Sequence, residues 1–263
     1  MDLGIRNERA LVVGASEGIG YASAQGLLEE GAEVAIVSRD AAKLQAATDR
    51  LQRTAGRPVA SCAADVTKAA DVERLARWAE GAMPQLDILV HAVGGSTRKS
   101  FEALSDEEWQ ASYDFNVLSA VRVIRAFLPL LKKSRQGRVV ILGAAGARMP
   151  YPNQIVSNVH KAGLIALVKT LGAELAPDNI RVNSVSPGRT LTSLWITRAA
   201  AMAKERGTNP DEIIREFTHE IPLGRFGQPE EIAAMVVFLA SHKASYVNCQ
   251  SVLVDGGIAR GLL

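Results

Sequence analysis

The sequence predicts an α/β fold in which one doubly wound parallel β-sheet of about seven strands is flanked by helices on both faces. Three observations support this prediction. Short apolar runs alternate with longer helical stretches from one end of the chain to the other. Most of the short runs are continuously apolar, which is typical of strands buried on both faces of a parallel sheet. The chain has 263 residues, 48% of them hydrophobic, and is long enough to bury one large core.

The expected strands are the short apolar runs, at 9–13, 33–38, 58–63, 86–93, 137–142, 180–186 and 251–254. The expected helices lie between them, at 18–30, 41–55, 69–81, 106–131, 154–175 and 229–241. This alternation predicts βαβ units joined by right-handed crossovers. One region, 190–227, is polar, irregular and helix-prone, and a long excursion inside an α/β domain is typical of a substrate lid. We therefore expect residues 1–263 to form one domain with one lid.

Composition excludes several classes of protein. The net charge is only +2, and no basic block or acidic tail is present, so we expect neither disorder nor a nucleic-acid partner. No apolar run approaches the roughly 18 residues that a membrane span needs, and residues 1–10 are too polar for a signal peptide. Two cysteines suit neither a disulfide framework nor a zinc site. We expect a cytoplasmic protein without a metal site, an enzyme or a descendant of one.

A glycine-rich turn joins the first expected strand to the first expected helix, and it reads Gly14-Ala15-Ser16-Glu17-Gly18-Ile19-Gly20. Glycine lets the backbone turn tightly and approach a pyrophosphate, whose charge then lies at a helix N-terminus. An ordinary glycine-rich turn is the alternative, but the position after the first strand of a βαβ unit favours a Rossmann-type dinucleotide site. The expected cofactor contacts in this turn are Gly14, Ser16, Glu17, Gly18, Ile19 and Gly20.

The end of the second expected strand indicates which dinucleotide binds. Dinucleotide sites usually have an acid there for the adenosine ribose hydroxyls, whereas this chain has Ser38-Arg39. A guanidinium can pair with a 2′-phosphate and stack on adenine, which favours NADP over the alternative, NAD. Glu17 counts against this choice because a positive residue in the turn would suit a 2′-phosphate better. The alternative for Arg39 is an ordinary solvated side chain.

With this turn in place, the chain resembles the short-chain dehydrogenase/reductase family over nearly its whole length, and within it the 3-oxoacyl-carrier-protein reductase-like branch. The matching residues follow in family order: Asp65-Val66, Asn116, Lys161 and Val254-Asp255-Gly256-Gly257. The resemblance implies that Asp65 and Val66 contact the adenine and that Asn116 and Lys161 belong to the active site. It implies further cofactor contacts at Ala92, Gly94, Lys161, Pro187, Gly188, Thr190 and Thr192. His91-Ala92 stands where the family usually has two asparagines, so His91 could be a ligand or shuttle, although a structural histidine is expected.

The chain departs from the family at the catalytic pair. The resemblance implies a tyrosine four residues before Lys161 and a serine further upstream, but this chain has Ser157 and Ala144 there. In the family mechanism the tyrosine phenol protonates the carbonyl oxygen while hydride arrives from the nicotinamide. The lysine lowers the phenol pKa, and the serine holds the substrate oxygen. An alcohol such as Ser157 is a much weaker acid with a shorter reach, so this mechanism cannot run unchanged.

Other groups could replace the absent ones. Ser157 and Lys161 lie one helical turn apart on one face, so Ser157 could hold the substrate oxygen while Lys161 supplies the proton through a water or a ribose hydroxyl. Asn116 would position that water. Tyr151, in the loop before this helix, is the other candidate donor, and a packing tyrosine is the alternative. His160 points about 100° away from Lys161 on a helix and is expected to pack.

Three functions remain open from the sequence. The first is an NADP-dependent oxidoreductase that reduces a small or acyl carbonyl substrate. The second is an NADP(H)-binding protein without redox turnover, acting as a regulatory or hetero-oligomeric partner. The third is non-redox chemistry in the same pocket, such as proton abstraction beside a carbonyl. Trp195, Phe217 and Ile221 suggest a partly apolar substrate pocket or an amphipathic helix packing on the body, and no basic cluster along the sequence marks a carrier-protein dock.

We also expect a homotetramer, with a dimer as the alternative. Family members commonly assemble through long helix pairs and the last strand, and residues 228–241 and 251–263 resemble those elements. The apolar tail Gly261-Leu262-Leu263 is better explained by burial at a subunit contact than by exposure.

Overall fold

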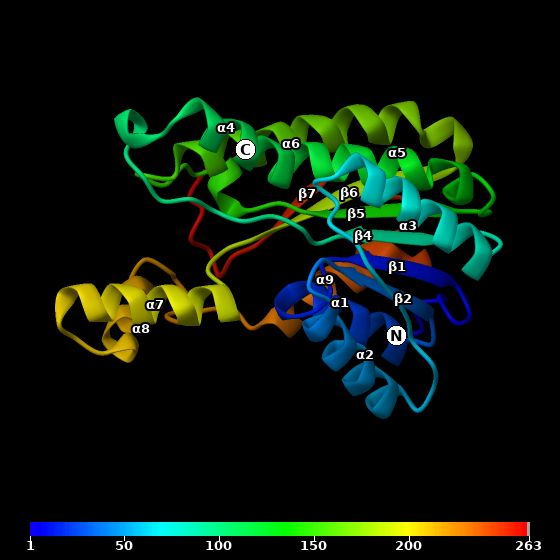
Figure 1. The fold of residues 1–263 in the computed structure, drawn as a ribbon, viewed down its shortest axis with the longest axis horizontal. Helices are drawn as coiled ribbons and strands as arrows, with labels where there is room; N and C mark the ends of the chain where they lie inside the picture. Colours follow the sequence, from blue (N-terminus) through cyan, green and yellow to red (C-terminus); the bar gives the residue numbers. More distant parts are fainter. Residues whose placement is uncertain (262–263) are drawn as a thin grey trace.

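Seven parallel strands form one sheet in the computed structural model, which describes residues 1–261 (Figure 1). The strand order is β3-β2-β1-β4-β5-β6-β7. The strands are β1 (Arg9–Val13), β2 (Glu33–Ser38), β3 (Ala60–Ala63), β4 (Ile88–His91), β5 (Gly137–Leu142), β6 (Ile180–Pro187) and β7 (Ser251–Val254). This order confirms the doubly wound parallel sheet. The order reverses between β1 and β4, and in such sheets ligands bind outside the carboxyl ends of the strands at that point.

Helices cover both faces of the sheet (Figure 1). One layer holds α1 (Gly18–Glu29), α2 (Ala41–Ala55) and α9 (Pro229–Ala240), and the other holds α3 (Ala69–Ala82), α5 (Ser119–Leu131) and α6 (Ile155–Glu174). Strand β1 shows why its run is continuously apolar: Val12 packs into the core under the first layer, and Leu11 packs into the core under the second. Both side chains are fully buried.

Two predicted strands differ from the structure by more than one residue at an end, and one predicted helix is divided. β3 begins at Ala60 rather than at 58, and β4 spans Ile88–His91 rather than 86–93. Gly94, three residues after the end of β4, has a φ of +155°. The predicted helix 106–131 is α4 (Asp106–Tyr113), a π-helical turn (Asp114–Leu118) and α5.

The π-helical turn carries one of the predicted active-site residues. Asn116 lies within it, and its side-chain Nδ2 donates to the carbonyl oxygen of Ser112 at 3.0 Å. That carbonyl is part of the helix backbone, so the side chain takes an acceptor that a regular helix would use for its own ladder. π-Helical turns are rare and occur frequently at functional sites.

The region 190–227 contains two helices, α7 (Ser193–Arg206) and α8 (Pro210–Thr218), which project from the body (Figure 1). Its two ends are joined by a parallel bridge between Thr190 and Gly227. The helices pack on each other around a small core that includes Ala199, Ile213 and Phe217. The helix-forming character predicted for this region is therefore confirmed.

No helix in the part of the chain that the structure describes is both long enough and apolar enough to cross a membrane. Leu262 and Leu263, the end of the apolar tail for which a subunit contact was predicted, lie outside the described residues.

Candidate functional site

A cleft of about 410 Å³ lies at the carboxyl ends of the strands. This volume is within the range of small-molecule sites. Every residue for which a cofactor contact was predicted lines it: Gly14, Ser16, Glu17, Gly18, Ile19, Gly20, Ser38, Arg39, Asp65, Val66, Ala92, Gly94, Lys161, Pro187, Gly188, Thr190 and Thr192. Of the predicted catalytic residues, Tyr151, Ser157 and Lys161 also line the cleft, whereas Asn116 lies behind its wall.

The glycine-rich turn is packed too closely for larger residues. Gly14 has a φ of +87°, and a Cβ there would lie 2.8 Å from the carbonyl oxygen of Ala92. A Cβ on Gly20 would collide with the carbonyl oxygen of Gly14. The backbone therefore enters α1 with no side chain between the turn and the cleft at these positions. A pyrophosphate fits such a turn because its charge is stabilised by the N–H groups at the helix N-terminus.

Polar and basic side chains lie at the end of β2. Ser38 Oγ donates to Ser16 Oγ at 3.0 Å, which links β2 to the glycine-rich turn. The guanidinium of Arg39 is exposed, lies 6.0 Å from the Phe115 ring, and has no carboxylate within 4 Å among residues 1–261. Glu17, which counted against NADP in the sequence, lies 3.5 Å from the ammonium of Lys43. That ion pair partly offsets the negative charge of the turn.

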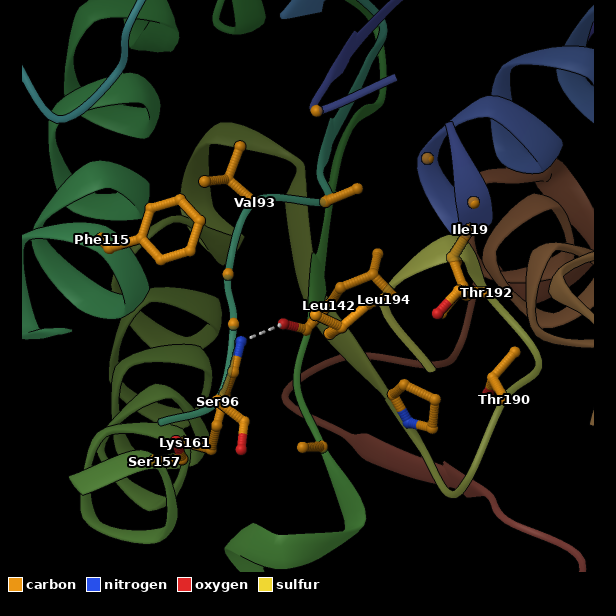
Figure 2. A pocket seen from close by; sticks show the side chains of 18 of the residues that line it. Ile19, Val93, Ser96, Phe115, Leu142, Ser157, Lys161, Thr190, Thr192 and Leu194 are labelled. Atoms are coloured by element: carbon orange, nitrogen blue, oxygen red, sulfur yellow. Dashed lines mark hydrogen bonds between the residues drawn. The ribbon is translucent and has the colours of Figure 1, made fainter. Parts of the chain in front are cut away.

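Lys161 is the buried cation of the cleft wall. Its Nζ donates to the carbonyl oxygen of Leu142, the last residue of β5, at 3.1 Å (Figure 2). Burial lowers the pKa of this ammonium from its ordinary value of 10.5 to about 8. Gly94 lies directly against it, since a Cβ on Gly94 would be 2.5 Å from Nζ. The loop after β4 therefore needs glycine at this position.

Ser157 lies near Lys161 on α6 (Figure 2). Its Oγ accepts a hydrogen bond from the backbone N–H of Thr97 at 3.2 Å, which leaves the hydroxyl proton available to another acceptor. Asn116 supports the same loop from behind, because its Oδ1 accepts from the N–H of Gly95 at 3.0 Å. Asn116 therefore holds the loop at residues 94–97 from behind and does not line the cleft.

Tyr151 presents a polar group that no described residue satisfies. Its hydroxyl is buried and has no hydrogen-bond partner within residues 1–261. Burial raises the pKa of this phenol, and the guanidinium of Arg189, 5.9 Å from the ring, lowers it by less. Asn158 fixes the loop by donating from Nδ2 to the carbonyl oxygen of Tyr151 at 2.9 Å. Ala144 contributes only a methyl group to the same cleft.

The two histidines near the site are packed rather than reactive. His91 is fully buried, with Nε2 3.3 Å from Ser119 Oγ, and burial together with Lys161 lowers its pKa to about 3. It is therefore neutral at pH 7. His160 has Nδ1 3.0 Å from Ser112 Oγ and stacks edge-on against Trp109, as the helix geometry predicted.

The sequence did not identify the arginines of the cleft. Arg98, Arg189 and Arg198 all line it, and they come from the loop after β4, the end of β6 and α7. No linear pattern signals this convergence. The suggestion that Trp195, Phe217 and Ile221 line an apolar pocket holds only for Trp195, which lines the cleft. Phe217 and Ile221 are buried in the core of the α7–α8 region.

Known proteins resemble the whole chain. A family model described as enoyl-(acyl carrier protein) reductase matches residues 14–259. The 2,3-dihydro-2,3-dihydroxybenzoate dehydrogenase of Bacillus subtilis is 33% identical over 263 residues, which cover 98% of each protein. The human dehydrogenase/reductase SDR family member 4 is 36% identical over 254 residues, 96% of this chain and 88% of that protein. The structure of L-sorbose reductase from Gluconobacter frateurii, complexed with NADPH and L-sorbose, is 33% identical over 100% of both chains, with a TM-score of 0.96.

The low pKa of Lys161 predicts a specific dependence of stability on pH. Between about pH 8 and 10.5 the unfolded chain keeps a proton that the folded chain has released, so stability rises with pH in this window. The free energy of unfolding of the unmodified protein, minus that of Lys161→Met, should increase by about 3 kcal/mol from pH 7 to pH 10.5. Urea unfolding at several pH values measures it.

The matched control is Lys169→Met, which removes an exposed lysine from the same helix. If the unmodified protein and Lys161→Met show parallel curves over this pH range, the ammonium of Lys161 is not desolvated as described.

Proposed function

The chain belongs to the short-chain dehydrogenase/reductase family, and we propose that it is an NADP-dependent oxidoreductase that reduces a small or acyl carbonyl compound by hydride transfer. The observation that carries this proposal is the buried ammonium of Lys161, which lies in the wall of a cleft that also contains the dinucleotide turn. The names of the relatives include both a sugar and a carboxylate substrate. The substrate of this chain therefore has to be argued from its own residues.

The cofactor of this chain is NADP(H). The glycine-rich turn accommodates the pyrophosphate, while Ser38 and Arg39 lie where the adenosine 2′-phosphate would bind. The ion pair of Lys43 with Glu17 reduces the repulsion that such a phosphate would meet. When bound, the reduced nicotinamide supplies the hydride.

Addition of hydride to a carbonyl leaves a negative oxygen that needs a proton. The ammonium of Lys161, whose pKa burial lowers to about 8, can give that proton through a water molecule and regain it from solvent. Ser157 can donate its hydroxyl proton in a hydrogen bond to the same oxygen. Its Oγ already accepts a hydrogen bond from the N–H of Thr97, which leaves the hydroxyl proton for another acceptor. Asn116 acts as a positioning residue, since it holds the loop that contacts both groups.

Tyr151 is the second candidate for the proton donor. Tyr151 lines the cleft, and its buried hydroxyl has no hydrogen-bond partner among residues 1–261. An unsatisfied buried hydroxyl is costly unless a ligand completes it. The raised pKa keeps the phenol protonated at neutral pH. A substrate oxygen within reach would give this hydroxyl its missing acceptor.

A second function, binding of NADP(H) without turnover, is favoured by one observation. The resemblance to the family implies a catalytic tyrosine and serine where this chain has Ser157 and Ala144. The cofactor side of the cleft has no comparable substitution that would block binding. A regulatory or hetero-oligomeric partner would have this combination.

We propose three further properties of the chain. The α7–α8 region, 190–227, acts as a lid over the cleft, because Leu194 and Trp195 of α7 contribute to its lining. The protein assembles as a homotetramer. Its location is cytoplasmic, in line with the two free cysteines, Cys62 and Cys249.

Assembly is measured by light scattering. We expect the mass of a tetramer at micromolar concentration, since residues 228–241 and 251–263 resemble the elements through which family members commonly assemble. A monomer mass would refute both the tetramer and the dimer.

The dissociation constants for NADPH and NADH test the role of Arg39. The unmodified protein should bind NADPH more tightly, and Arg39→Asp should reverse the order. Loss of charge-assisted bonds to the 2′-phosphate costs roughly 1.5–3 kcal/mol. Arg53→Asp makes the same charge change at an exposed position of α2 outside the cleft, and it should preserve the preference. Equal affinities in the unmodified protein would contradict the assignment of NADP.

Turnover in active-site variants tests the proposed chemistry, with NADPH oxidation over a panel of ketones as the measurement. Lys161→Ala should abolish turnover and weaken NADPH binding, whereas Ser157→Ala should mainly lower turnover. General acid assistance is worth about 10²–10⁴ in rate, so the unmodified protein should be slow. If Tyr151 is the donor, Tyr151→Phe stops catalysis and Ser157→Ala is tolerated.

Restoring the family pair with Ala144→Ser and Ser157→Tyr is the complementary experiment. It should raise the rate, provided that the cleft accommodates the ring. Tight NADPH binding with no oxidation by any ketone would support the binding protein instead. Full activity in Lys161→Ala would rule out the role given to that residue.

A further inference from the structure

Two arginines that line the cleft, Arg98 and Arg198, have no salt bridge to a carboxylate among residues 1–261. Thr97 donates its backbone N–H to Ser157 Oγ, and Arg98 is the next residue in the chain. Arg198, on α7, donates to the carbonyl oxygen of Ser96 at 3.3 Å. Both arginines line the cleft. Both arginines are thus connected to the loop at residues 96–98, whose Thr97 contacts Ser157. Arg98 belongs to this loop, and Arg198 reaches it from α7.

A third arginine differs from these two because it is already neutralised. Arg189 is buried, and its guanidinium lies 2.5 Å from a carboxylate oxygen of Glu220. It also donates to the carbonyl oxygen of Phe217 at 2.5 Å. Its hydrogen bonds fix it in place against the α7–α8 region, so it is not a free anion ligand.

Neither Arg98 nor Arg198 has a carboxylate within 4 Å in the described part of the chain. The Arg98 guanidinium lies 5.6 Å from the Phe217 ring, and the Arg198 guanidinium lies 5.2 Å from the Trp195 ring. Burial lowers the pKa of Arg198, and the charge of Arg98 lowers it further. The charges of Arg189 and Glu220 also act on Arg98, in opposite directions. Arginine stays charged under such shifts, so Arg98 and Arg198 present like charges along one cleft.

We propose that Arg98 and Arg198 form an anion-binding subsite that selects carbonyl substrates bearing a carboxylate, that is, oxo acids. The proposal rests on the proposed reductase function for the identity of the reacting group. The planar fork of each guanidinium matches a carboxylate, and an anion between the two would relieve their mutual repulsion. Because the subsite adjoins Ser157 through residues 96–98, the carboxylate and the reacting carbonyl belong to one small molecule.

A small acid is favoured over an acidic carrier protein by the position of Arg198. Its side chain is half-buried in the wall of the cleft and donates to the carbonyl oxygen of Ser96, whereas Arg98 is exposed. A carrier protein would contact an exposed side chain such as Arg98 more readily than Arg198. The phosphates of the cofactor are the other anions to consider, and the experiment separates them.

Calorimetric titration of the NADP⁺-saturated protein with benzoylformate and with its methyl ester tests the subsite. The two probes share the ketone and the ring and differ in the charge, and the oxidised cofactor prevents reduction. We expect the acid to bind at least about tenfold more tightly than the ester. Arg98→Gln and Arg198→Gln should each weaken binding of the acid by about tenfold and leave the ester unchanged. Lys204→Gln, an exposed change on α7 outside the cleft, is the matched control.

Arg98→Lys and Arg198→Lys, which keep the charge, should retain part of the preference for the acid. Thermal unfolding of every variant, compared with Lys204→Gln, establishes that each is folded. Equal affinity for acid and ester in the unmodified protein would overturn the proposal. So would a loss of NADP⁺ affinity in Arg98→Gln or Arg198→Gln, measured by titration with NADP⁺ alone, that accounts for the whole effect.

The titration needs no turnover, so its result is independent of the proposed reductase function. Preference for the acid without NADPH oxidation would support the subsite and contradict the reductase. NADPH oxidation with no preference for the acid would support the reductase and overturn the subsite.

Discussion

The site depends on one constraint, the burial of the ammonium group of Lys161 in the wall of the cleft. A buried charge is costly unless hydrogen bonds stabilise it, and here the carbonyl oxygen at the end of β5 accepts one from Nζ. The loop after β4 approaches this ammonium so closely that only glycine fits at position 94. Asn116, in the π-helical turn, then holds the next residue of that loop. The ammonium of Lys161 on α6 is thus contacted by the end of β5 and by the loop after β4. The π-helical turn in turn holds that loop.

In the proposed mechanism this arrangement keeps the supporting parts of an oxidoreductase site, with Ser157 and Ala144 where the family resemblance implies a tyrosine and a serine. A serine hydroxyl is a weaker acid than a phenol, but the desolvated lysine, with a pKa of about 8, is near the range in which general acids work best. Tyr151 lines the same cleft, and its phenol has no hydrogen-bond partner in the part of the chain that the structure describes. The proton donor is therefore whichever of Lys161 and Tyr151 reaches the substrate oxygen. The surrounding fold is the same in both cases.

Much of the fold was predictable because its signals are local. Buried parallel strands such as β1 are continuously apolar, and the turn from Gly14 to Gly20 must be glycine-rich for backbone reasons alone. The π-helical turn at Asn116 was not predictable, because a side chain competing for one backbone carbonyl leaves no periodic trace. Arg98 and Arg198 meet only through the tertiary fold, since about a hundred residues separate them in the sequence. The sequence could name the residues of the cofactor turn but not the charge of the substrate pocket.

The central proposal is that this cleft transfers hydride with Ser157 at the position where the family resemblance implies a tyrosine. Its most direct test is to incubate the protein with NADPH deuterated at both C4 positions and a panel of ketones and oxo acids, and to analyse the products by mass spectrometry. The account predicts alcohol products that each carry one deuterium on the former carbonyl carbon. Tight binding of the labelled cofactor with no deuterium in any product would contradict it. In a separate incubation in D₂O with unlabelled NADPH, exchange of solvent deuterium into the ketones without oxidation of the cofactor would also contradict it and indicate proton abstraction instead.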